Sequence, residues 1–164
     1  MLARSLNAIA FVAIFAAPIF ADEASHKVMD RWVGHWTGGV AGPNTEGVAA
    51  TPDHADAAWT LDDNFVQGTN STATGKPIGI WLLHHDSKSG KYKVWFFSAR
   101  GGVGEWTGTW NDDDNKMTWE GIDSPSGAKL TGYTKIAGNH QEWNLQVDNN
   151  GKVTTDSGSL ERKK

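Results

Sequence analysis

Residues 104–121 read GEWTGTWNDDDNKMTWEG, two aromatic runs separated by an acidic turn. Within each run, apolar or small side chains alternate with polar ones. A period of two places the two kinds of side chain on opposite faces of a β-strand. The segment therefore predicts a hairpin of two antiparallel strands, Glu105–Trp110 and Lys116–Ile122, joined by residues 111–115.

A similar pattern continues over most of the chain: short apolar runs are separated by Gly, Asn, Asp, Ser and Pro. One short helix, Glu23–Arg31, precedes these runs. The other predicted strands are Val33–Val40, Ala57–Leu61, Phe65–Thr72, Ile78–His85, Lys91–Ala99, Lys129–Ala137, Gln141–Val147 and Lys152–Glu161. The connections after Ile78 are short, which predicts an all-β antiparallel up-and-down meander, and such a meander avoids exposed edges by closing into a barrel.

The first residues have the layout of a secretory signal peptide. Residues 1–21, MLARSLNAIAFVAIFAAPIFA, carry one positive charge at Arg4, then an apolar segment, and end in alanine before an acidic start. The apolar segment is too short for a stable membrane span. We expect cleavage after Ala21, a single β-barrel domain over residues 22–164, and a periplasmic or secreted protein.

Composition narrows the function classes. The chain of 164 residues has no cysteine, which excludes thiol catalysis, iron–sulfur clusters and thiolate zinc sites. Its formal net charge of −4 provides no basic stripe, so no nucleic-acid partner is expected. No apolar run after the first segment reaches membrane-spanning length. The nine tryptophans can form most of a core or of the wall of a cavity, because each side chain buries about 150–250 Å² of surface.

Two short features at the ends of the domain resemble the calycin superfamily, which includes lipocalins, fatty-acid-binding proteins and avidins. Gly34-x-Trp36 begins the first strand after the helix, and Arg162 follows the last strand. In lipocalins the tryptophan of this motif plugs one barrel end, and an arginine from the last strand packs across its ring. The resemblance implies that Trp36 is a structural plug and that Arg162 covers it. A guanidinium over an indole contributes about 0.5–2 kcal/mol.

A longer pattern is similar to an uncharacterised family of exported bacterial calycin-like domains. It comprises the segments GHWTG (34–38), IGIW (78–81), YKVWFF (92–97), GEWTGTW (104–110) and MTWEG (117–121). The resemblance covers essentially all of the chain after the signal peptide. It implies a calycin-like β-barrel with a short N-terminal helix, and it implies no activity.

The tryptophans in the strands predict a ligand site inside the barrel, because indoles supply large flat contact areas. The predicted wall residues are Trp81, Trp95, Trp106, Trp119 and Trp143. Arg100 is a further candidate, since an inward arginine anchors polar head groups in fatty-acid-binding relatives. We therefore predict that the barrel binds a small apolar or aromatic molecule, without a cofactor, a metal ion or identified catalytic residues.

Two other classes of function compete with the ligand-binding prediction. Ile80–Leu83 and Val94–Phe97 are apolar on both faces, so their outer face is expected to be covered. The cover is the N-terminal helix, the loop of residues 41–56 or a second copy in a homodimer. In this alternative, side chains fill the barrel, and the protein is a structural or interaction module without a ligand. A third class is an isomerase or non-oxidative decarboxylase that uses an Arg–Glu pair in the pocket.

The histidines suggest two further sites, each with a simpler structural interpretation. His84 and His85 point to opposite faces of a strand and so cannot share one metal ion, which leaves His84 and Asp86 on one side. His140 lies in a turn between two late strands. Resemblance to the haem-binding nitrobindin branch of the calycins implies an axial haem ligand at such a position, and an exposed turn histidine is the alternative.

Overall fold

The computed structural model describes residues 23–38, 52–124 and 127–164. The predicted signal peptide with its cleavage site at Ala21 lies outside the described residues, as does most of the predicted loop of residues 41–56.

The described chain forms one short helix, one 3₁₀ turn and ten strands. They are α1 (Glu23–Met29), η1 (Asp30–Trp32), β1 (Gly34–Thr37), β2 (His54–Thr60), β3 (Phe65–Ser71), β4 (Pro77–Asp86), β5 (Lys91–Ser98), β6 (Val103–Asn111), β7 (Lys116–Ser124), β8 (Ala128–Ala137), β9 (His140–Asn149) and β10 (Lys152–Arg162). Among these, no helix is long and apolar enough to cross a membrane.

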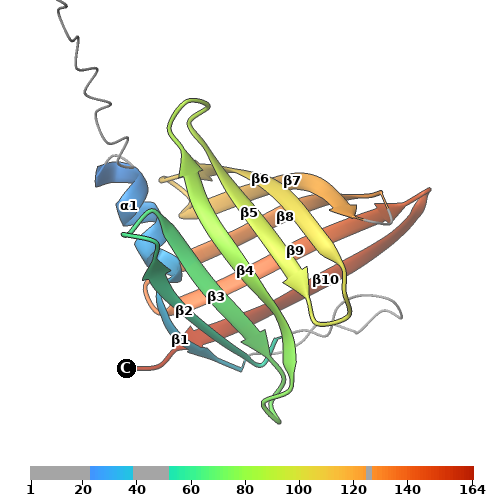
Figure 1. The fold of residues 1–164 in the computed structure, drawn as a ribbon, viewed down its shortest axis with the longest axis horizontal. Helices are drawn as coiled ribbons and strands as arrows, with labels where there is room; N and C mark the ends of the chain where they lie inside the picture. Colours follow the sequence, from blue (N-terminus) through green and yellow to red (C-terminus); the bar gives the residue numbers. More distant parts are fainter. Residues whose placement is uncertain (1–22, 39–51, 125–126) are drawn as a thin grey trace, which may run out of the picture.

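Every strand pairs antiparallel with its sequence neighbours, and the meander closes into a barrel (Figure 1). The closing pair joins β1 to β10, with Trp36 opposite Arg162 and Thr37 opposite Glu161. This seam has two residue pairs, so it is short compared with the ten residue pairs between β9 and β10. The predicted all-β meander barrel with a short N-terminal helix is confirmed.

Most element boundaries differ from the predicted ones by one to three residues, and two of these differences have a clear structural reason. Strand β2 begins at His54 rather than Ala57, because β3 continues to Ser71 and offers partners for the three additional residues. The helix ends at Met29, and a 3₁₀ turn follows in place of its last residues. This turn closes with a hydrogen bond from the Val33 N–H to the Asp30 carbonyl.

Large aromatic side chains inside the barrel lie beside glycines on neighbouring strands. Trp81 is opposite Gly68, and Trp119 lies between Gly108 and Gly132 on its two flanking strands. A Cβ atom at Gly108 would lie 2.5 Å from the Trp119 ring, and one at Gly68 would overlap the Trp81 ring. The glycines therefore provide the space that the indoles fill, which lets a narrow barrel hold several of them.

The N-terminal segment closes one end of the barrel, which we call the helix end; there β1 begins and β10 ends (Figure 1). Trp32 of η1 is 6% exposed and packs edge-on against Trp110 and Trp119, with ring centroids 6.0 and 6.5 Å away. Arg31 lies over the Trp110 ring, 4.9 Å from its centroid, and donates to Asn115 Oδ1 at 2.9 Å. The two contacts fix the turn against the β6–β7 hairpin.

Candidate functional site

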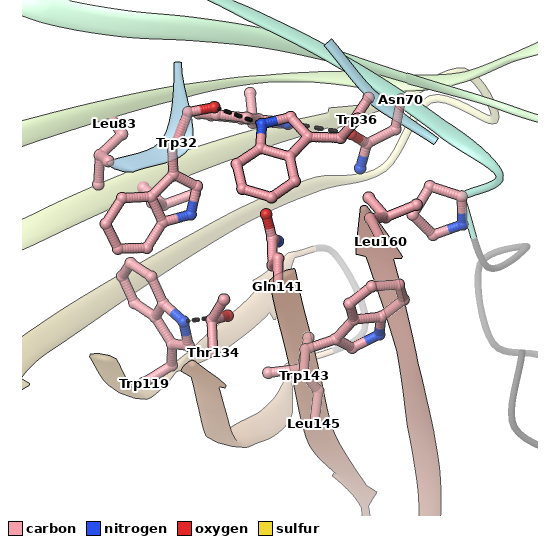
Figure 2. A pocket seen from close by; sticks show the side chains of 14 residues that line it. Trp32, Trp36, Asn70, Leu83, Trp119, Thr134, Gln141, Trp143, Leu145 and Leu160 are labelled. Atoms are coloured by element: carbon pink, nitrogen blue, oxygen red, sulfur yellow. Dashed lines mark hydrogen bonds between the residues drawn. The ribbon is translucent and has the colours of Figure 1, made fainter. Parts of the chain in front are cut away.

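A cavity of about 140 Å³ lies inside the barrel beneath the Trp36 ring (Figure 2). Its walls come from η1 and from nine of the ten strands, all but β6. The lining residues are Trp32, Trp36, Pro52, Ala55, Asn70, Trp81, Leu83, Val94, Trp119, Thr134, Gln141, Trp143, Leu145 and Leu160. None of these side chains is charged.

Three of the five predicted wall tryptophans line this cavity: Trp81, Trp119 and Trp143. The Trp119 indole N–H donates to Thr134 Oγ1 at 3.0 Å, and the Trp81 indole N–H donates to Asn70 Oδ1 at 3.1 Å. These bonds satisfy the polar atom of each ring and fix the ring plane. The two indoles therefore present immobilised apolar surfaces to the cavity.

Trp36 forms the roof of the cavity at the helix end. It is 1% exposed, and its indole N–H donates to the Trp32 carbonyl at 2.8 Å. The Arg162 guanidinium lies above the ring, 4.5 Å from its centroid, and its Nη2 donates to the Arg31 carbonyl at 2.6 Å. Residues from the N-terminal and the C-terminal part of the chain therefore both hold the Trp36 ring in place.

Gln141 of β9, like Asn70 and Thr134, is a polar side chain in the cavity that sequence reasoning missed. It alternates inward with Trp143 and Leu145, and Figure 2 shows its carboxamide pointing toward the Trp36 ring. Among the described residues, its carboxamide has no hydrogen-bond partner. A weak sequence signal existed, because Gln141, Trp143, Leu145 and Val147 share one face of the predicted strand.

The other two predicted wall tryptophans lie elsewhere. Trp106 points into the barrel, but it stacks on Phe96 at 6.0 Å rather than lining the cavity. Its indole nitrogen is buried without a hydrogen-bond partner in the described part of the chain. Trp95 lies on the outer face, 6.4 Å from the Phe65 ring.

The position of Trp95 follows from the register of the β4–β5 hairpin. Asp86 pairs with Lys91, so Trp81 lies opposite Phe96 and Trp95 lies opposite Leu82. Trp81 and Trp95 must therefore face opposite sides of the sheet. The turn at residues 87–90 was visible in the sequence, and counting back from it would have separated the two tryptophans.

Arg100 lies in the turn between β5 and β6, where its side chain is exposed and does not reach the cavity. The turn is closed by a hydrogen bond from the Gly101 N–H to the Ser98 carbonyl. The described residues that line the cavity therefore include no Arg–Glu pair of the kind expected for a decarboxylase or isomerase.

The outer face of the two apolar strands is partly exposed, with Ile80 at 45% and Phe97 at 39%. Val103 of β6 lies opposite Phe97 and extends this apolar surface. Helix α1 lies at the barrel end rather than across these residues (Figure 1). A homodimer through these strands stays a prediction.

The histidines lie outside the cavity. His84 stacks on Phe65 on the outer face, with ring centroids 4.6 Å apart, whereas His85 packs against Tyr92. His140 is exposed at the start of β9, where its Nδ1 is 2.5 Å from a Glu161 carboxylate oxygen. Among the described residues, no three His, Asp or Glu side chains are placed to hold a metal ion.

One carboxyl group has a clearly shifted pKa, and it too is remote from the cavity. Hydrogen bonding from Ser89 and from the Lys88 backbone N–H lowers the pKa of Asp86 to about 2, with Lys93 adding a nearby positive charge. These contacts order the β4–β5 turn by stabilising the ionised carboxylate.

Comparison with known proteins adds to the fold but not to the site. No protein-family model matches the chain, and no curated protein sequence matches it. A solved structure, that of Rv2717c from M. tuberculosis, matches with a TM-score of 0.62 at 16% identity. The match covers 88% of this chain and 99% of the other. The two proteins share a barrel fold. At this identity the likeness carries no ligand from one chain to the other.

Proposed function

We propose that this protein binds a small apolar or aromatic molecule in the cavity beneath Trp36. The observation that carries the proposal is the wall of fixed indoles. Trp81 and Trp119 have their polar atoms satisfied by Asn70 and Thr134, so apolar ring surface is what meets the cavity. Water gains few hydrogen bonds on such walls, which favours an apolar occupant.

The volume of the cavity limits the size of the ligand. An apolar cavity of about 150 Å³ in another protein binds benzene, whereas sites for drug-sized ligands measure about 300–1,000 Å³. The cavity of about 140 Å³ belongs with the first group. The proposal is therefore for a molecule with one aromatic ring, whereas a fatty acid or a haem would have to extend beyond this space.

Titration of the purified domain tests the proposal. Toluene and phenol, added separately, are expected to change the tryptophan fluorescence and to raise the melting temperature, because a ligand that binds only the folded state stabilises it. Palmitate and haem serve as controls, because both molecules are larger than the cavity. If neither toluene nor phenol changed the fluorescence or the melting temperature, the proposal would be wrong.

A cavity-filling substitution gives a sharper test. Ala55 is 7% exposed and lines the cavity, so Ala55→Leu places three extra carbon atoms in the space that the ligand needs. We expect toluene affinity to fall at least about tenfold, a change of about 1.4 kcal/mol, while thermal stability is kept or rises. Isothermal titration calorimetry and thermal unfolding measure the two quantities.

The matched control is Ala58→Leu on the same strand. Ala58 is exposed on the outer face, so the added side chain leaves the cavity unchanged. Equal loss of affinity in both variants would show that toluene binds elsewhere.

We also propose that residues 1–21 direct export and that the domain belongs with the calycins. The layout of the first 21 residues supports the former. The pairing of Trp36 with Arg162 across the seam supports the latter. N-terminal sequencing of protein recovered from outside the cytoplasm is expected to begin at Asp22. A chain that still begins at Met1 would contradict export with cleavage.

A further inference from the structure

Three of the five indole N–H groups that line the cavity are engaged by neighbouring groups. The indole N–H groups of Trp36, Trp81 and Trp119 donate to the Trp32 carbonyl, Asn70 and Thr134 respectively. These groups therefore have little left to offer a ligand, and they form the apolar part of the site.

In the described part of the chain, the Gln141 carboxamide and the indole N–H groups of Trp32 and Trp143 are without such bonds, and of these three only the carboxamide offers an acceptor as well as donors. The Gln141 backbone is held between Ile136 of β8 and Leu160 of β10, and the side chain extends beneath the Trp36 ring (Figure 2). It has no hydrogen-bond partner among the described residues, although it offers both an acceptor oxygen and donor N–H groups. The amide is partly buried and lines the cavity, so a ligand there that supplies a partner gains a hydrogen bond.

The charge of the site restricts that ligand further. None of the described side chains that line the cavity is charged, and Arg162 lies above the Trp36 ring with its Nη2 bonded to the Arg31 carbonyl. An ionic ligand in the cavity would lose its hydration without gaining an opposite charge. The site therefore favours a neutral molecule.

We propose that Gln141 is the specificity-determining residue of the cavity, and that the ligand is a neutral single-ring compound with one hydrogen-bonding group, such as the hydroxyl of a phenol. This inference rests on the proposed function, since it assigns the chemistry of the same cavity. The ring lies among Trp81, Trp119 and Trp143, and its hydroxyl bonds to the Gln141 carboxamide.

Calorimetric titration of the wild-type domain and of Gln141→Leu with phenol, toluene and benzoate tests this assignment. The measured quantity is the ratio of phenol affinity to toluene affinity. We expect the ratio to fall at least about tenfold in Gln141→Leu, because phenol loses its hydrogen bond while toluene keeps its contacts. Benzoate is expected not to bind the wild-type domain.

Gln146→Leu is the matched control, since Gln146 is on the same strand with its side chain exposed on the outer face. An unchanged ratio in Gln141→Leu, with both compounds still bound, would overturn the role of Gln141 and leave the proposed function standing. Benzoate binding as tightly as phenol would overturn the neutral ligand class. If neither toluene nor phenol binds the wild-type domain, the proposed function itself fails.

Discussion

Trp36→Ala is expected to lower the free energy of unfolding by about 4 kcal/mol, within the range of about 3–5 kcal/mol for truncating a buried tryptophan. The ring is 1% exposed, lies under the Arg162 guanidinium and donates to the Trp32 carbonyl. Its removal enlarges the cavity, leaves the guanidinium without its ring and removes the hydrogen bond to the Trp32 carbonyl of η1. Urea unfolding followed by circular dichroism measures the effect.

Trp95→Ala is the matched control, because it removes the same side chain from the outer face. Trp95 is half-buried there and packs near Phe65, so we expect a loss of about 1 kcal/mol. Similar losses in the two variants would contradict the role of Trp36 as the roof of the core.

Gly132→Ala is expected to be the second most disruptive single change, with a loss of about 3 kcal/mol or more. A Cβ atom at this position would overlap the Asn144 carbonyl oxygen and lie 2.8 Å from the Leu145 Cα atom. Both contacts are with the backbone of β9, which is held in register by the sheet. The clash therefore cannot be relieved by rotating a side chain. Thermal and urea unfolding measure the loss.

Gly138→Ala separates this clash from the general effect of replacing a glycine. Gly138 has a φ of +61°, and a Cβ atom there would meet nothing within 4 Å. Only the conformational penalty remains, which is about 1–2 kcal/mol. If Gly138→Ala proved as destabilising as Gly132→Ala, backbone overlap would not be the cause.

The sequence was sufficient to predict the barrel because the pattern is local. Alternating aromatic and polar residues define the strands, and short turns such as residues 111–115 fix the order of pairing. The boundaries of the strands were harder to predict from the sequence. The start of β2 depends on how far β3 extends on the other side of the pair, which no property of His54 itself reveals.

The site was harder to predict because it depends on which side chains are brought together across the barrel. Alternation alone placed Trp119 and Trp143 on a single face of their strands, but it could not distinguish a wall of the cavity from the Phe96–Trp106 stack. Gln141 carries no motif. Its significance comes from its position beneath Trp36, a residue more than one hundred positions earlier in the chain.

The short seam between β1 and β10 has a consequence for the synthesis of the protein. Trp36 is made early, whereas Arg162, its partner across the seam, follows more than one hundred residues later. A nascent chain cannot close the barrel until β10 has left the ribosome, and its unpaired strand edges stay open to other chains until then. Closure of the barrel therefore comes late, because the first strand of the barrel has to wait for the last one.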